Sequence, residues 1–231
     1  ETAKRKKSPL LLASQLISAK FSAGSSQDSS SRNLIISKEG ETLFDNIASP
    51  LTGSYQEKNI ATYTAAALEL CRIMGFSADK IKDGIENVQK NFVLNGRWQI
   101  VDKSPLTICD TGHNPGCLTE TMAQIKSLTY QTLHFVIGFV NDKDIETIFT
   151  LLPREAQYYA CAASVERAFP ASELTKKMSE AGFKTEQCST VTEAYSKAKA
   201  NAKNEDVIFV GGSTFVVADF IKGEKAHFSL S

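Results

Sequence analysis

The chain has 231 residues, of which 42% are hydrophobic and 23% charged, an ordinary globular composition that excludes disorder throughout. Lys plus Arg and Asp plus Glu both number 26, so there is no basic surplus to bind a nucleic-acid backbone. A zero net charge does not exclude a local cationic pocket. No apolar run approaches the roughly 18 residues of a membrane span and no signal-peptide pattern is present, so we expect a soluble, cytoplasmic protein.

The first fifty residues predict short extended segments. A helix tail and a turn at Ser8–Pro9 lead into a short buried strand, Leu10–Ala13. Residues 22–33 are rich in Ser, Gly and Asp and predict an exposed loop between two extended segments. Residues 33–48 alternate around the turn 38–40, as a hairpin does, so this region resembles the strand-rich edge of something larger.

A helical period begins at Asn59 and stops at Gly75. One face of this helix is expected to carry Ile60, Tyr63, Ala67, Leu70 and Met74. A second helix is expected from Ser77, with Ile81, Ile85 and Val88 on its apolar face.

After residue 97 the pattern becomes strand, helix, strand, helix, which is typical of βαβ units and a mainly parallel sheet. We therefore place a domain boundary near Arg97 and predict an α/β, doubly wound domain after it. The expected strands are 106–109, 133–140, 158–163, 184–188 and 207–210. The expected helices are 118–128, 145–152, 171–181, 191–202 and one from Thr214.

The five cysteines form no C-x-x-C pair and are odd in number, so they predict reduced, buried side chains of a cytosolic protein. They are Cys71, Cys109, Cys117, Cys161 and Cys188.

Ligands of open parallel sheets collect at the carboxyl ends of strands, and three segments fit that description. The most informative is Asp110 to Pro115. Asp110 can accept hydrogen bonds from a ribose hydroxyl or an amine, and His113 can donate to a phosphate. The alternative, with about equal weight on physical grounds, is that Asp110 or Asn114 caps a helix.

The other strand ends give weaker signals. Asp142, Lys143 and Asp144 precede a helix, and Asp144 fits an N-cap better than a ligand site. Gly211–Ser213 allow either a close approach to a ligand or only a tight turn. Arg97 follows a glycine and suits bidentate phosphate binding, with a surface ion pair as the alternative.

Several catalytic patterns are absent from the sequence. There is no G-x-x-x-x-G-K-[ST] loop, no G-x-G-x-x-G after a strand and no G-x-S-x-G. The three histidines lack spaced partners, so a metal site is not expected, and His134 fits a core position better than a ligand role.

The motifs taken together resemble folylpolyglutamate synthases, the folate branch of the Mur ligase superfamily. "GRWQIV…PLTICDTGHNPG" is similar to the G-R-x-[EQ]…D-[GA]-A-H-N-P element of that family, and "SYQEKNIATYTAAALELC" to its H-Q-x-x-N helix. "GFVNDKDIETIFTLL", "VERAFPASEL" and "FVGGSTFVVADF" resemble further segments. Thr111–Gly112 and Tyr55 depart from the family letters, which puts only the fine shape of the pocket in doubt.

This resemblance implies a Rossmann-like C-terminal domain over residues 97–231, preceded by the terminal part of a central ATPase domain over residues 1–96. The family's P-loop and Mg²⁺ ligands would lie in a part that the sequence lacks, so we expect a fragment without turnover of its own. By resemblance, Asn59 contacts the adenine of ATP, Arg97 its phosphates and Asp110 its ribose. His113 lies beside the nucleotide and the glutamate, and Ser213 is a substrate-binding candidate.

The implied reaction is ATP-dependent amide ligation, in which a folate or dihydropteroate carboxylate is phosphorylated and then attacked by the amine of L-glutamate. Arg97 and His113 are the catalytic candidates, and the two domains would share the nucleotide. We expect Asp110→Ala to raise the KM for ATP or abolish activity while leaving folding intact. The alternatives are a peptidoglycan Mur ligase, or a Rossmann-like binding module that is not an enzyme.

Overall fold

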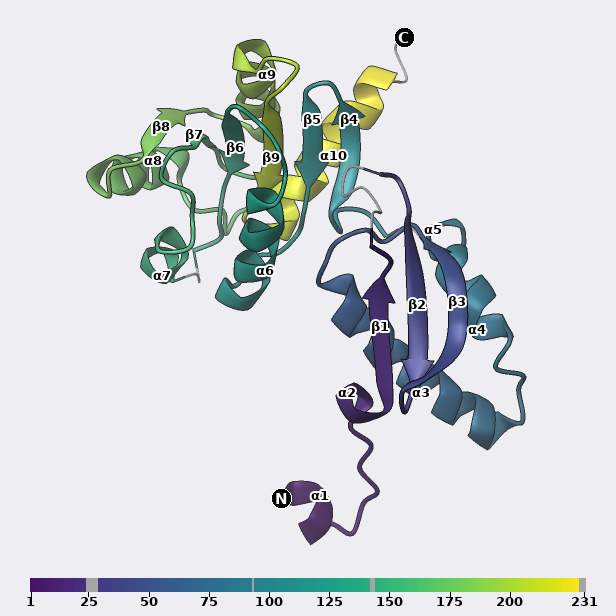
Figure 1. Cartoon of the computed structure of the whole chain (residues 1–231). Coiled ribbons are helices and arrows are strands. Elements are labelled where there is room, and N and C mark those ends of the chain that lie inside the picture. Colours follow the sequence, from purple (N-terminus) through teal and green to yellow (C-terminus); the bar gives the residue numbers. More distant parts are fainter. Residues whose placement is uncertain (24–28, 93, 142–143, 229–231) are drawn as a thin grey trace. The chain divides into compact units, whose positions relative to one another are not determined.

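The computed structural model describes residues 1–23, 29–92, 94–141 and 144–228 of the chain (Figure 1). The chain forms two compact units, Glu1–Val93 and Leu94–Ser231. The division lies close to the boundary predicted near Arg97. That the first unit is part of an ATPase domain stays a prediction.

The first unit contains an antiparallel sheet of β1 (Ile17–Phe21), β2 (Arg32–Lys38) and β3 (Glu41–Ser49), in that order. The predicted hairpin is confirmed, because β2 and β3 pair around Glu39 and Gly40. Both turn residues have positive φ, 50° and 91°, which gives the turn the twist that neighbouring strands need. The predicted loop connects β1 and β2, and its residues 24–28 lie outside the described residues.

The helices α3 (Gln56–Met74), α4 (Lys80–Glu86) and α5 (Val88–Asn91) follow the sheet. Gly75 ends α3 in the left-handed conformation, as predicted, but the helix begins before Asn59. The predicted apolar face is partly wrong, since Leu70 and Met74 are more than half exposed. The side of the helix that packs in the core of the first unit keeps Ile60 and Ala67 of the predicted face and adds Ala61 and Leu68. The buried residues of the helix are Gln56, Ile60, Ala61 and Thr64.

The predicted strand Leu10–Ala13 is wrong. The segment between α1 (Thr2–Arg5) and α2 (Ala13–Leu16) belongs to no strand, and Leu10, Leu11 and Leu12 are 63%, 58% and 47% exposed. A strand needs a neighbour for its backbone groups, and none of the described strands pairs with this segment.

The second unit contains a six-stranded sheet in the order β4-β5-β9-β6-β7-β8. Every pairing in this sheet is parallel except that of β4 with β5, so the predicted α/β fold with a mainly parallel sheet is confirmed. β9 lies between β5 and β6, so the chain reverses its winding direction there. The strands are β4 (Gln99–Lys103), β5 (Leu106–Cys109), β6 (Leu133–Ile137), β7 (Gln157–Ala160), β8 (Lys184–Gln187) and β9 (Val207–Gly211). The sequence patterns did not predict β4.

Helices cover both faces of this sheet and enclose two apolar cores (Figure 1). One core contains side chains of α6 (Pro115–Lys126), α7 (Ile145–Phe149) and α8 (Ala171–Glu180). The other contains side chains of α9 (Val191–Asn201) and α10 (Thr214–Phe228). Both cores form because side chains alternate between the two faces of each strand. On β9, Phe209 lies in the first core, and its neighbours Ile208 and Val210 lie in the second.

The cysteines are free thiols, as expected, but they are not uniformly buried. Cys109, Cys161 and Cys188 lie in the core, whereas Cys117 is exposed in the first turn of α6. Burial is the main cause that raises the pKa of Cys109 to about 12 and that of Cys188 to about 11, so these thiols stay protonated and unreactive at neutral pH.

Candidate functional site at the carboxyl edge of the parallel sheet

The antiparallel strand β4 brings the turn Gly96–Trp98 to the carboxyl edge of the parallel strands. Gln99, the first residue of β4, pairs with Cys109, the last residue of β5. The turn before β4 therefore lies beside the segment that follows β5, and the Thr111 N–H donates to the Gly96 carbonyl at 2.9 Å. The sequence patterns alone gave no reason to bring these two segments together.

The Asp110 carboxylate holds both segments. It is 2% exposed, and its Oδ2 accepts the Trp98 N–H at 2.7 Å while its Oδ1 accepts the Gly112 N–H at 2.7 Å. Its own N–H donates to the Val210 carbonyl, which ties the segment to β9. Carboxylate bonds to backbone N–H groups are strong, and a buried N–H without a partner is costly. The geometry thus gives Asp110 a structural task, and its predicted contact with ribose stays a prediction.

The turn that carries Arg97 has an unusual backbone. Gly96 and Trp98, on either side of Arg97, have φ of 69° and 49°. A Cβ on Gly96 would lie 2.6 Å from Val217 Cγ1, so only glycine fits there. Positive φ is rare for a bulky residue such as Trp98, which is held by burial of its ring at 1% exposure and by Asp110. Such outliers are common at functional sites.

Arg97 is exposed, and among the described residues no hydrogen bond or ion pair involves its guanidinium. The alternative of a surface ion pair therefore has no partner in the part of the chain that the structure describes. A planar guanidinium on a fixed turn is suited to bidentate recognition of a phosphate.

His113 and Asn114 follow Asp110 and take different roles. Asn114 caps α6, because its side-chain oxygen accepts the Cys117 N–H at 3.0 Å, and Pro115 occupies the first helical position. The predicted alternative of a helix cap is thus confirmed for Asn114. His113 is half-buried, and its Nδ1 lies 3.0 Å from the Thr111 carbonyl. Since a carbonyl only accepts, Nδ1 carries a proton, and Nε2 of the neutral ring is an acceptor.

The end of β9 meets the same edge. Gly212 has φ of 90°, and a Cβ there would lie 2.9 Å from the Gly138 carbonyl, so the backbones approach closely. Ser213 is 3% exposed, and its Oγ accepts the Phe215 N–H at 3.2 Å as α10 begins. Its predicted contact with substrate stays a prediction, and Thr214 is the exposed neighbour.

A cavity of about 430 Å³ lies at this edge of the second unit, which is a usual size for a small-ligand site. Asn95 precedes the Arg97 turn, Thr111 follows Asp110, and Thr214 starts α10, so three separate segments line the cavity. Its other lining residues are Val217, Ala218, Ile221 and Lys222.

Two further predicted sites lie elsewhere. Asp144 is the N-cap of α7, as predicted, with its carboxylate accepting the Thr147 N–H and hydroxyl. These bonds hold the pKa of Asp144 below its ordinary value. Asp142 and Lys143 lie outside the described residues. Asn59 is exposed on α3 in the first unit, where its Nδ2 donates to Gln56 Oε1 at 3.0 Å. Its role toward adenine stays a prediction.

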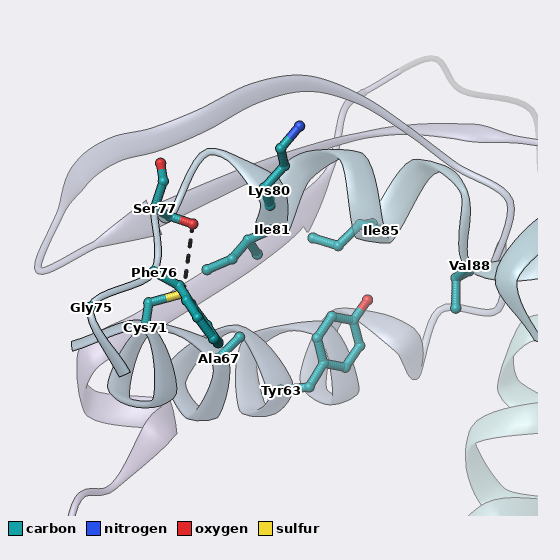
Figure 2. Close-up of a pocket in the computed structure, with 11 residues that line it drawn as sticks. Tyr63, Ala67, Cys71, Gly75, Phe76, Ser77, Lys80, Ile81, Ile85 and Val88 are labelled. Atoms are coloured by element: carbon teal, nitrogen blue, oxygen red, sulfur yellow. Dashed lines mark hydrogen bonds between the residues drawn. The ribbon is translucent and has the colours of Figure 1, made fainter. Parts of the chain in front are cut away.

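The first unit has its own cavity, of about 720 Å³, between α3 and α4 (Figure 2). Tyr63, Ala67 and Cys71 line it from α3, and Ile81 and Ile85 face them from α4 (Figure 2). Its walls are mostly apolar, so it does not suit the phosphates of a nucleotide.

Within the described residues, no three or more His, Cys, Asp or Glu side chains form a group that could hold a metal ion. For this reason we assign no metal ligand to the described residues.

None of the described helices is both long enough and apolar enough to cross a membrane.

Residues 96–214, which include this edge of the sheet, match the protein family described as Mur ligase, glutamate ligase domain. The match covers more than half of the chain and includes Arg97, Asp110 and His113. The chain belongs to the Mur ligase family.

Named relatives come mainly from folate metabolism. The chain is 32% identical over 158 residues to the dihydrofolate synthase/folylpolyglutamate synthase of Escherichia coli, a match over 67% of this chain and 36% of that protein. It is 27% identical over 185 residues to a probable bifunctional folylpolyglutamate synthase/dihydropteroate synthase of Haloferax volcanii, over 80% of this chain and 21% of that protein. A UDP-N-acetylmuramoyl-L-alanyl-D-glutamate–2,6-diaminopimelate ligase of Geobacillus kaustophilus is 28% identical over 72% of this chain.

A solved structure of E. coli FolC in complex with DHPP and ADP has the same fold, with a TM-score of 0.75 and 26% identity. The match covers 98% of this chain and 50% of the FolC chain. The matches thus cover about half of that FolC chain, 36% of the E. coli relative and 21% of the Haloferax volcanii relative.

Trp98 and Gln99 were not predicted as members of this site. Both lie in "GRWQ", and Gln99 occupies the [EQ] position of the motif that identified the resemblance. This motif position was the available signal for Gln99. The contact of the Gln99 side chain with Gly96 depends on the geometry of the turn and could not be predicted from residue spacing.

Proposed function

We propose that this chain is part of an ATP-dependent ligase that joins L-glutamate to a folate through an amide bond, the activity of a folylpolyglutamate synthase. The observation that carries the proposal is the pairing of the Arg97 turn with the His113 segment through Asp110. Support comes from the family match over this region and from the folate enzymes among the relatives. The FolC structure that contains DHPP and ADP supports a nucleotide and a pterin as ligands.

The reaction transfers the terminal phosphoryl group of ATP to a substrate carboxylate, with ADP leaving. The amine of glutamate then attacks the acyl carbon, phosphate leaves, and the amine loses a proton. Positioning and charge neutralisation are the main catalytic tasks in such a transfer. Arg97 would neutralise charge on the phosphates, and Mg²⁺ would add to this when bound.

His113 fits a role toward the attacking amine. Because Nδ1 is committed to the Thr111 carbonyl, Nε2 of the neutral ring can accept a proton or orient the amine of glutamate. Asn59, Asp110 and Ser213 are proposed binding residues on the strength of the resemblance, and their contacts with adenine, ribose and substrate rest on it alone.

The test is a ligation assay on the complete gene product with ATP, Mg²⁺ and L-glutamate. Tetrahydrofolate, dihydropteroate and a UDP-muramyl peptide serve as alternative acceptors, and mass spectrometry identifies the ligated product. Glutamate added to tetrahydrofolate in an ATP-dependent way supports the proposal, and addition to dihydropteroate would extend it to the second activity that the E. coli relative is named for. No ligation to either folate acceptor would refute it.

The peptidoglycan alternative has one observation in its favour, the relative in Geobacillus kaustophilus. The same assay decides between the two when 2,6-diaminopimelate is supplied as a second amine beside L-glutamate, because ligation to the UDP-muramyl acceptor alone would replace the folate proposal by this one.

A further inference from the structure

The Gln99 side chain closes the turn that carries Arg97. Gln99 Oε1 accepts the Gly96 N–H at 2.8 Å, so the amide folds back from the first residue of β4 to the first residue of the turn. Gln99 is half-buried, and its backbone is fixed by pairing with Cys109. The Gln99 acceptor is therefore anchored on the sheet, while the Gly96 N–H that it binds belongs to the turn.

The turn depends on such bonds because its backbone is rarely populated. Gly96 and Trp98 both have positive φ, and the Trp98 conformation is unfavourable for a bulky side chain. The two N–H groups on either side of Arg97 are taken separately: Gly96 donates to Gln99, and Trp98 donates to Asp110. Removing the Gln99 acceptor would leave the Gly96 N–H unpaired, so that only the bond from the Thr111 N–H to the Gly96 carbonyl would hold that end of the turn.

Among the described residues, the Arg97 guanidinium makes no hydrogen bond or ion pair, so the position from which the side chain leaves the turn is set by the backbone on either side. We propose that Gln99 is a positioning residue, which fixes the turn from which Arg97 reaches the phosphates of ATP. This inference rests on the proposed function, because it assumes that Arg97 binds a nucleotide.

The chemistry of residue 99 separates this role from simple packing. Glutamine and glutamate both offer an Oε1 acceptor, whereas methionine has a similar length and shape but no comparable acceptor. Gln99→Glu should therefore keep the turn, and Gln99→Met should release it while filling the same space. Gln157 provides a matched control, since it is also half-buried and also begins a strand of this sheet.

The experiment measures kcat and the KM for ATP on the complete gene product, with folate and glutamate saturating. Gln99→Met should raise the KM for ATP roughly three- to tenfold, the effect of losing one hydrogen bond that orients a binding group. Gln99→Glu should stay within about twofold of wild type, and so should Gln157→Met.

A double-mutant cycle tests whether Gln99 acts through Arg97. In an Arg97→Ala background, Gln99→Met should change the KM for ATP by less than about twofold, because the side chain being positioned is gone. A purely structural role would give the same factor in both backgrounds, together with a lower melting temperature.

Two outcomes overturn the inference: an unchanged KM for ATP in Gln99→Met, or an effect of equal size with and without Arg97. Neither refutes the proposed function, which fails only if the wild-type protein performs no ATP-dependent ligation to a folate acceptor. The two failures are therefore distinguished by the wild-type activity measured in the same series.

Discussion

Two buried aspartates stand at opposite edges of the parallel sheet and make similar bonds. Asp110, 2% exposed at the carboxyl edge, accepts backbone N–H groups from Trp98 and Gly112. Asp206, 4% exposed just before β9, accepts the N–H groups of Thr132 at 2.9 Å and Lys203 at 2.7 Å. Each carboxylate ties together two segments that are distant in the sequence.

The difference lies in the side chains around them. At Asp206 the nearby histidine, His134, is itself buried, with Nδ1 3.1 Å from the Tyr159 hydroxyl and Nε2 3.4 Å from the carboxylate. At Asp110 the segments that it holds present an exposed Arg97 and a half-buried His113. A buried aspartate near a histidine is therefore not by itself a sign of function. What matters is whether the segments that it fixes leave polar side chains open to a ligand.

Removing the carboxylate at the carboxyl edge is the largest expected effect. Asp110→Ala leaves the Trp98 and Gly112 N–H groups without this acceptor, which we expect to lower the free energy of unfolding by about 2–5 kcal/mol. This revises the expectation that the substitution would leave folding intact. Urea unfolding measures it, and Trp98, the only tryptophan, should report a red-shifted emission as its turn loosens.

Asp102→Ala is the matched control for that measurement. Its carboxylate is partly exposed and pairs with Lys199 at 3.1 Å, and surface pairs of this kind contribute at most about 1 kcal/mol. Equal losses in the two variants would contradict the structural task assigned to Asp110.

Removing the side chain that the turn presents should separate activity from stability. Arg97→Ala should lower kcat/KM of the complete gene product roughly a hundredfold, as the loss of one transition-state donor does. The free energy of unfolding should change by less than about 0.5 kcal/mol, because the side chain is exposed. Arg97→Lys keeps the charge without the bidentate geometry and should give an intermediate rate. A wild-type rate in Arg97→Ala would remove Arg97 from the site.

A substitution within the turn tests its geometry directly. Gly96→Ala combines positive φ with a Cβ placed 2.6 Å from Val217 and 2.8 Å from Thr111, and should cost about 2–3 kcal/mol of stability. Gly75→Ala is the control, since its φ of 71° is similar but nothing lies within 4 Å of the added Cβ. It should cost only about 1 kcal/mol in the same urea titration. Equal costs would mean that the close packing of the turn is unimportant.

Sequence patterns predicted the second unit well because its strands and helices alternate in short, separated runs. The predicted strand 106–109 matches β5, and Asp144 is the helix cap that its residue type favours. In the first unit, Gly75 likewise ends α3 as its residue type favours. The predictions failed where the structure of a segment depends on the element that packs or pairs with it. Leu10–Leu12 are apolar enough for a strand but have no neighbouring strand among the described residues. On α3 the core includes Ile60 and Ala67 of the predicted face, but the end of that face, with Leu70 and Met74, is exposed.

At the candidate site, the residue types were predictable, but the hydrogen bonds that connect the segments were not. Asp110 and His113 were proposed from their position after a strand, and Arg97 from its glycine neighbour. Their connection needed β4, an antiparallel strand whose short run of mixed residues gave no clear alternation. The bonds from Gln99 and Asp110 to the turn follow from this strand, so no local pattern could reveal them.

The smallest expected effect is at the opposite edge, and its sign depends on pH. Burial of the Asp206 carboxyl raises its pKa, but the N–H groups of Lys203 and Thr132 and the His134 ring together hold this pKa below its ordinary value. A lowered pKa in the folded state means that the carboxylate stabilises the fold above the ordinary pKa of about 3.9. This stabilisation is lost as the pH falls through the lowered value.

Asp206→Asn cannot titrate, so it separates this contribution from the rest of acid unfolding. At pH 5 to 7 the variant should be about 1 kcal/mol less stable than wild type, because a charged acceptor is replaced by a neutral one. The difference should begin to shrink as the pH falls below the ordinary pKa of about 3.9, and it should shrink further as the pH falls through the lowered pKa of the folded state. Urea titrations followed by Trp98 fluorescence measure it, with the exposed neighbour Glu205→Gln as control. A difference that stayed constant from pH 3 to 7 would show that the Asp206 carboxylate does not contribute through its charge, and the likeness between the two aspartates would then end at their geometry.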